Sequence, residues 1–274
     1  MKRILGISLL ALFILASLVQ AIHAEPRIIF QMNDSKGDDY GAGKLLYPTH
    51  DVFVRGLFDL QKFEVVEDLD HLYFYFTLAT LTNPFGAPEG YFHQRIDLYI
   101  HLEQGGNNEI ELGDYLLKTS PEYGWQVHLA VAPFNETFIL VETEGESRVY
   151  SEGITSWVLE DDRTILVQVD KNLLPKPEAS WSYYVLVGSF DGLASDFWRD
   201  LGADSWQLRG EGVPVFDILA PRWGSKNQKR QLTQGLLYPV RAKEHRLKRY
   251  VLLLLGFVML IFVFILWRWH YGRA

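Results

Sequence analysis

The sequence of 274 residues contains no cysteine. This absence excludes disulfides, a cysteine nucleophile and the Cys-x-x-Cys-His attachment of a c-type haem. The chain also lacks the Gly-x-Ser-x-Gly motif of serine hydrolases, and its histidines show no spacing typical of a metal site. Its carboxylates are scattered over predicted turns and polar strand faces, where solvation explains them. We therefore expect a protein that is not an enzyme.

A basic surface is missing from most of the chain. All but one of the 34 acidic residues precede position 223, whereas the segment after that position is basic. Nucleic-acid binding requires a basic face, so the long acidic part is unsuited to it. No internal repeat is evident either.

Residues 1–24 have the pattern of a secretory signal. Lys2 and Arg3 precede an apolar stretch over residues 4–19, and small residues near Ala24 offer a cleavage site. Because one residue at that site is large, an uncleaved N-terminal anchor is the alternative. In both cases we expect the body of the chain to be exported.

A second apolar stretch lies near the C-terminus. Residues 251–266 carry no charge and are flanked by aromatic residues, which suit a membrane–water interface. We expect a basic juxtamembrane linker over residues 223–249, a transmembrane helix over residues 250–269 and a short tail over residues 270–274. The protein would then be a single-pass protein of the cell membrane, with residues 25–222 on the extracytoplasmic side. This orientation opposes the positive-inside rule, and we retain it because a long exported domain fixes orientation before the last helix emerges.

Apolar and polar residues alternate with a period of two through much of the body. The alternation is clearest in residues 96–103, 125–132, 165–170 and 181–188. Turn-forming residues separate these runs at 105–108, 145–147 and 160–163. Short strands joined in this way predict an all-β, antiparallel β-sandwich rather than βαβ units. Only residues 193–201 suggest a helical turn, and Trp125 and Trp181 fall in the apolar phase, which predicts core positions.

Two segments rich in glycine and aspartate bracket the predicted strands. The first begins at Gly37 and continues to Val65, and the second runs from Val187 to Leu219 with an Asp-Gly and a Trp-Arg pair. With the Asn-Pro-Phe of residues 83–85, they resemble the C-terminal domain of bacterial glucodextranases and amylopullulanases. The resemblance covers about residues 28–222. It implies a DOMON-like, jelly-roll-like β-sandwich related to family 9 carbohydrate-binding modules, and non-catalytic binding of an α-glucan or envelope glycan.

The second segment supplies most of the residues that we expect to contact sugar. Flat aromatic faces pack on sugar C–H groups, and amides, carboxylates or arginine bind hydroxyls. The candidates are Gln94, Asp191, Trp198, Arg199 and Trp206. The alternative is that both tryptophans pack one end of the sandwich while Arg199 bridges to a carboxylate. Phe85 stands where the family usually has tryptophan, and its smaller face would lower the affinity for a stacked sugar.

Four aspartates in and around the first segment offer the hard oxygen ligands that calcium prefers. They are Asp34, Asp38, Asp39 and Asp59. The spacing differs from that of an EF-hand loop, and the alternative is a turn whose aspartates cap backbone amides. Asp59, at a predicted strand start, has the further alternative of satisfying buried backbone. Calcium is the one cofactor that the sequence predicts.

Two other functions stay open. The first is a structural envelope protein whose sandwich contacts an S-layer protein or a neighbouring copy, and the second is a haem-binding DOMON redox module. For haem, Met32 is the one methionine of the exported body. Expected partners are a polysaccharide or cell-surface glycan, the membrane, and a glycoside hydrolase, sugar transporter or S-layer protein.

Overall fold

The computed structural model describes residues 26–143, 146–178 and 180–241. The predicted signal segment (1–24), transmembrane helix (250–269) and tail (270–274) lie outside the described residues. Within the described ranges, no helix has the length and apolar character needed to cross a membrane.

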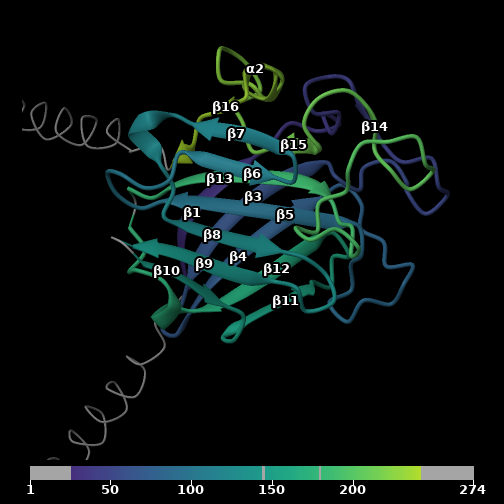
Figure 1. Ribbon diagram of the computed structural model, residues 1–274. Helices are drawn as coiled ribbons and strands as arrows, with labels where there is room; N and C mark the ends of the chain where they lie inside the picture. Colours follow the sequence, from purple (N-terminus) through teal and green to yellow (C-terminus); the bar gives the residue numbers. More distant parts are fainter. Residues whose placement is uncertain (1–25, 144–145, 179, 242–274) are drawn as a thin grey trace, which may run out of the picture. The chain divides into compact units, whose positions relative to one another are not determined.

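Two antiparallel sheets dominate the fold, as the period-two alternation predicted (Figure 1). The five-stranded sheet has the order β1 (Arg27–Asn33), β3 (Leu60–Glu67), β4 (His71–Leu78), β12 (Thr164–Asp170), β11 (Ile154–Val158). The seven-stranded sheet has the order β10 (Glu146–Tyr150), β9 (Phe138–Thr143), β8 (Val127–Val131), β5 (Gln94–His101), β13 (Ser182–Ser189), β15 (Val215–Ile218). Its last strand, β17 (Val240–Arg241), also pairs with β13.

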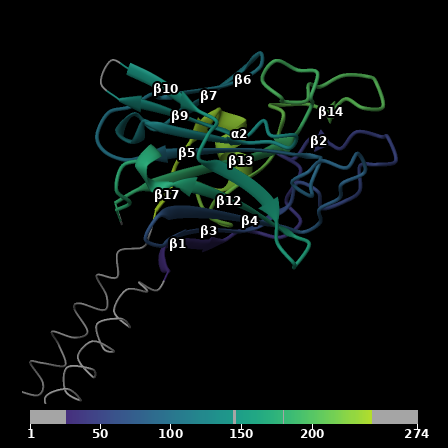
Figure 2. The same ribbon diagram turned by 90° about the horizontal axis from the view of Figure 1, so that it is seen from below.

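Smaller elements cover the outer face of the larger sheet or close its ends. They are β6 (Glu109–Leu112), β7 (Tyr115–Thr119), β16 (Leu236–Leu237), the β2 (Leu45–Leu46) and β14 (Arg209–Gly210) pair, α2 (Gln228–Gln234), and 3₁₀ turns at Pro121–Tyr123 and Lys171–Leu173. Figure 2 shows the molecule from below, with both sheets in view.

The hydrophobic core lies between the two sheets. Alternate residues of β4, such as Phe74 and Phe76, are fully buried in it, together with Leu98 of β5 and Val185 of β13. Strands β5 and β13 are buried on both faces, because a second cluster under β6, β7 and α2 covers their outer side. This arrangement is that of a β-sandwich.

The predicted turns and core tryptophans are confirmed in part. Residues 160–163 form the predicted hairpin turn between β11 and β12, and both Trp125 and Trp181 are buried. Residues 105–108 are not a hairpin tip, because β5 pairs with β8 and β13 while Asn107 bridges to Trp125. Residues 193–201 contain turns and no helix.

The folded unit continues beyond the boundary predicted at residue 222. Helix α2 begins after Asn227, whose side chain caps the Arg230 amide, and ends at Gly235 in the left-handed conformation with φ of 64°. Gln228 is buried, with its Oε1 accepting from the Ile218 amide at 2.8 Å. Helix α2 is anchored to the sheet by a polar side chain rather than by a long apolar face. Its polar sequence therefore looked like that of a linker.

Candidate functional site

Three loops gather at one end of the seven-stranded sheet. They connect β4 to β5 (79–93), β8 to β9 (132–137) and β13 to β14 (190–208). Antiparallel pairing of β8, β5 and β13 brings the start of β5 beside the ends of its two neighbours. The loops therefore meet on the β14 side of the sheets in Figure 1.

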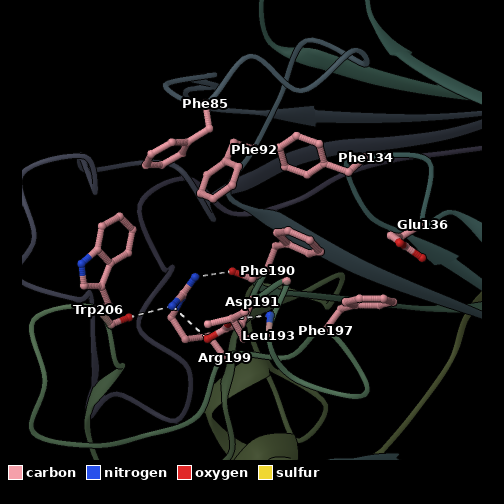
Figure 3. A pocket seen from close by; sticks show the side chains of 11 residues that line it. Phe85, Phe92, Phe134, Glu136, Phe190, Asp191, Leu193, Phe197, Arg199 and Trp206 are labelled. Atoms are coloured by element: carbon pink, nitrogen blue, oxygen red, sulfur yellow. Dashed lines mark hydrogen bonds and ion pairs between the residues drawn. The ribbon is translucent and has the colours of Figure 1, made fainter.

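These loops enclose a cavity of about 720 Å³, here called the aromatic pocket. Its lining residues are Phe85, Phe92, Phe134, Glu136, Phe190, Asp191, Gly192, Leu193, Phe197, Arg199 and Trp206. Figure 3 shows Phe85, Phe92 and Phe134 on one side of the cavity, facing Trp206, Phe190 and Phe197. The rim is exposed, since Leu193 is 99% and Phe85 50% accessible to solvent. The pocket thus presents aromatic faces, with few polar groups, to whatever enters it.

A buried carboxylate fixes the turn that carries Phe134. Phe134 and Asn135 both have positive φ, 63° and 64°, a conformation that costs free energy in residues other than glycine. Glu89 offsets that cost by accepting from both of their amides, at 2.9 and 2.6 Å. Because Glu89 is buried, these two hydrogen bonds hold the phenyl ring in place at the pocket wall.

Arg199 is a scaffold for the pocket floor. Its Nε donates to Ser189 Oγ, its Nη1 to Asp191 Oδ2 and the Trp206 carbonyl, each at 3.0 Å, and its Nη2 to the Phe190 carbonyl at 2.6 Å. Four of the five guanidinium donors are therefore used within the protein. Burial lowers the pKa of Arg199, while the Asp191 carboxylate raises it. The arginine thus ties the Asp191 side chain to the Trp206 backbone at the cavity and has one guanidinium N–H that makes no hydrogen bond in the described residues.

The two tryptophans of this segment have different environments. Trp198 is 2% exposed and donates from Nε1 to Asp97 Oδ2 at 3.0 Å. It lies against Gly188, where an added Cβ would be 1.9 Å from Trp198 Cζ3, so only glycine fits there. Trp206, in contrast, lines the pocket and packs on the His50 ring with centroids 4.0 Å apart. Trp198 is a core residue, and Trp206 is available to a ligand.

The structure brings together three of the five residues predicted to contact sugar: Asp191, Arg199 and Trp206. Gln94 is fully buried and donates from Nε2 to the Leu57 carbonyl at 2.8 Å, where it ties two segments together. Gln94 and Trp198 are therefore outside the pocket.

Sequence reasoning missed most of the pocket wall. Phe92, Phe134, Phe190, Phe197 and Glu136 come from three loops far apart in the chain. The sequence signal that could have found these residues is the concentration of phenylalanine in predicted loops. Large apolar residues outside the core often mark a binding surface.

A histidine without hydrogen-bond partners lies beneath the pocket. His93 is fully buried, its ring packs on Phe53 and Phe92 at 4.8 and 5.0 Å between centroids, and both nitrogens lack partners. Burial, and then the Arg199 charge, lower the pKa of His93 from 6.5 to about 4. The imidazole is therefore neutral at neutral pH.

Two of the four aspartates predicted to bind calcium come together, and a third carboxylate joins them. Carboxylate oxygens of Asp34, Asp38 and Asp217 lie within 4.8 Å of one another, and this group is here called the aspartate cluster. Asp39 instead accepts from the Tyr47 hydroxyl. Asp59 accepts from the Gly37 amide at 2.8 Å and from Gln61 at 3.2 Å, which is the backbone-satisfying alternative.

The chain was compared with known families and proteins. The sequence model for a family described as the C-terminal binding module, SLH-like, of glucodextranase matches residues 29–246. The matched range contains the aromatic pocket, the aspartate cluster and the elements after residue 222. No curated protein matches the chain at a significant level. Because the match covers most of the sequence, the chain belongs to the family of glucodextranase C-terminal binding modules.

Proposed function

We propose that this protein binds carbohydrate without catalysis and that the aromatic pocket receives an α-glucan or an envelope glycan. The observation that carries the proposal is the cavity of about 720 Å³, lined largely by aromatic rings, in a chain that belongs to a binding-module family. Its volume falls in the range of roughly 300–1,000 Å³ that is usual for small-ligand sites.

The chemistry of the lining suits a ligand that brings its own hydroxyl groups. Trp206 and Phe85, with ring centroids 6.0 Å apart, offer faces for the C–H surface of a sugar ring. The Asp191 and Glu136 carboxylates accept from hydroxyls, and the remaining N–H of Arg199 donates to one. Most of the binding free energy would come from the rings, because the polar groups are few.

We further propose that the module acts at the cell membrane. Export by residues 1–24 and anchoring by residues 250–269 would hold the pocket on the extracytoplasmic side. Tethering raises the local concentration of a bound glycan near a membrane-associated glycoside hydrolase or sugar transporter.

The exposed rim favours a second candidate, a structural role in the envelope. Leu193, Phe85 and Phe134 are large apolar residues that are open to solvent around one cavity. Such a rim also suits an apolar side chain of an S-layer protein. Haem has less support at this site, because the lining includes neither histidine nor methionine to serve as an axial ligand.

Affinity electrophoresis of the purified full-length chain in gels containing soluble α-glucan, together with a glycan array, tests the proposal. We expect retardation that Trp206→Ala abolishes. Trp223→Ala is the matched control, because Trp223 is 78% exposed and outside the pocket. If Trp206→Ala binds like the wild type, or if the wild type binds no glycan, the sugar proposal is wrong. Binding to isolated surface-layer protein instead would favour the structural role.

A further inference from the structure

The aspartate cluster joins segments that are far apart in the sequence. Asp34 and Asp38 lie in the loop after β1, and Asp217 lies in β15. Calcium–oxygen distances are about 2.3–2.6 Å, so oxygens on opposite sides of one ion are up to ~5 Å apart. The limit of 4.8 Å between the three carboxylates is therefore compatible with a single shared cation.

Each of the three carboxylates keeps one buried oxygen without a partner. Asp217 is fully buried; its Oδ2 accepts from the Leu60 amide at 2.8 Å, while its Oδ1 has no hydrogen bond. Asp34 accepts from the Ala220 amide at 3.2 Å through Oδ1, and its Oδ2 has none. Asp38 Oδ1 is likewise buried and unpartnered. A carboxylate oxygen buried in this way costs free energy unless a proton or a cation satisfies it.

Asp217 lies next to an irregularity in β15. The register between β13 and β15 shifts so that Asp217 is opposite Val187 and Val215 is opposite Gly188, which leaves Phe216 as an extra residue. Val187 and Phe216 both belong to the core between the sheets. Its pairing with Val187 thus puts the Asp217 carboxylate on the core side of a buried strand, where an apolar residue is the ordinary choice.

No basic side chain neutralises the cluster through an ion pair in the part of the chain that the structure describes. The ion pairs found there involve other carboxylates. Burial is the main cause that raises the pKa of Asp34 to about 8 and that of Asp38 to about 6; the Asp38 charge adds to the first shift, and the charges of Asp59 and Asp39 add to the second. Burial, and then repulsion from Asp34 and Asp38, raises the pKa of Asp217. Arg222 lines the cavity that reaches Asp38 and favours its charged form, but it makes no ion pair with the cluster.

We propose that Asp34, Asp38 and Asp217 bind one calcium ion at the junction of the two sheets. All three donors are carboxylate oxygens, which select a hard cation. Two of them lie in a loop, and calcium tolerates such variable geometry better than magnesium, which requires a near-ideal octahedron. A cavity of about 210 Å³ reaches Asp38, which gives space for water ligands.

The ion would connect three parts of the fold. Asp34 and Asp38 hold the loop after β1, Asp217 belongs to the seven-stranded sheet, and Asp217 also binds the first residue of β3 in the five-stranded sheet. The proposal is independent of sugar binding, because the cluster shares no residue with the aromatic pocket.

Calorimetric titration of calcium chloride into the chelator-treated full-length chain tests the proposal, with magnesium chloride titrated in parallel. We expect one calcium ion per chain, and binding at least ~10-fold weaker in Asp217→Asn. Asp39→Asn is the matched control; Asp39 lies one residue from Asp38 but outside the cluster, so this variant should bind calcium like the wild type. Calcium should raise the melting temperature of the wild type and leave that of Asp217→Asn unchanged.

If Asp217→Asn fails to fold, Asp38→Asn replaces it, because the Asp38 side chain is only half-buried and lies in a loop. Calcium binding that is unchanged in the cluster variants overturns the proposal. Absence of calcium binding in the wild type overturns it as well, and a proton shared between Asp34 and Asp217 then explains the unpartnered oxygens. Preferential binding of magnesium would overturn the choice of calcium.

Discussion

The aromatic pocket and the aspartate cluster satisfy their polar groups in opposite ways. At the pocket, Arg199 uses four of its donors within the protein, so that mainly rings face the cavity. At the cluster, three carboxylates converge and each leaves a buried oxygen unpartnered. Most of the Arg199 donors are therefore satisfied within the protein, and the structure of the pocket does not depend on a bound ligand. The cluster leaves buried carboxylate oxygens that only a proton or a cation would satisfy.

The largest effect should separate Trp198 from Trp206. Trp198→Ala removes a fully packed indole and its hydrogen bond to Asp97, and should lower the free energy of unfolding by about 3–5 kcal/mol. Trp206→Ala removes a partly exposed ring and should cost less than about 1.5 kcal/mol. Denaturant unfolding of both full-length variants measures the two values. Equal losses would contradict the division between scaffold and ligand surface.

The second effect depends on pH and tests whether the pocket floor is dry. The pKa of His93 is depressed from 6.5 to about 4, so between these values the unfolded chain binds the proton more readily than the folded one. Stability contributed by neutral His93 should be complete above pH 6.5 and lost as the pH falls to about 4, by up to ~3 kcal/mol.

His93→Leu is the variant that isolates this contribution. It keeps an apolar group of similar size and loses no hydrogen bond, since both ring nitrogens lack partners. Unfolding free energies of the variant and the wild type, measured between pH 4 and 7, should therefore converge at neutral pH and separate in acid. Parallel curves would show that His93 titrates normally and that water reaches the floor.

The third effect should appear at the cluster alone. Calcium at about 100 times its dissociation constant should raise the free energy of unfolding by ~2.7 kcal/mol, and Asp217→Asn should remove this gain. In chelator, the same variant should be at least as stable as the wild type, because the substitution relieves repulsion with Asp34 and Asp38. Chemical unfolding with and without chelator measures both terms. A variant destabilised equally in both conditions would indicate a purely structural Asp217.

The sequence predicted the sandwich because alternation records which face of each strand is buried. It predicted less of the two sites, since both depend on features that alternation does not show. Asp217 is a carboxylate on the core side of β15, where a pattern of burial predicts an apolar residue, and Trp198 lies in the core because Gly188 leaves room for its ring. The adjacent residues Trp198 and Arg199 were therefore assigned to one surface although only the second lines the pocket. The residues after 222 were misjudged for a related reason, because buried glutamines anchor α2.

The smallest effect concerns Phe85, on the rim of the pocket. Phe85 is half exposed, and its ring centroid is 4.5 Å from that of Phe92 and 6.0 Å from that of Trp206, so a larger ring can extend into solvent without displacing the core. Phe85→Trp enlarges the face that packs on a sugar ring and should tighten α-glucan binding about 3- to 10-fold, equivalent to ~0.7–1.4 kcal/mol. Leu69→Trp is the matched control, because Leu69 is exposed on the turn between β3 and β4 and is absent from the pocket lining. Affinity electrophoresis over a series of glucan concentrations gives the dissociation constants. Weaker glucan binding by Phe85→Trp, with Leu69→Trp unchanged, would mean that the rim fits the phenyl ring to another ligand, and the apolar side chain of an envelope protein would then be the better occupant.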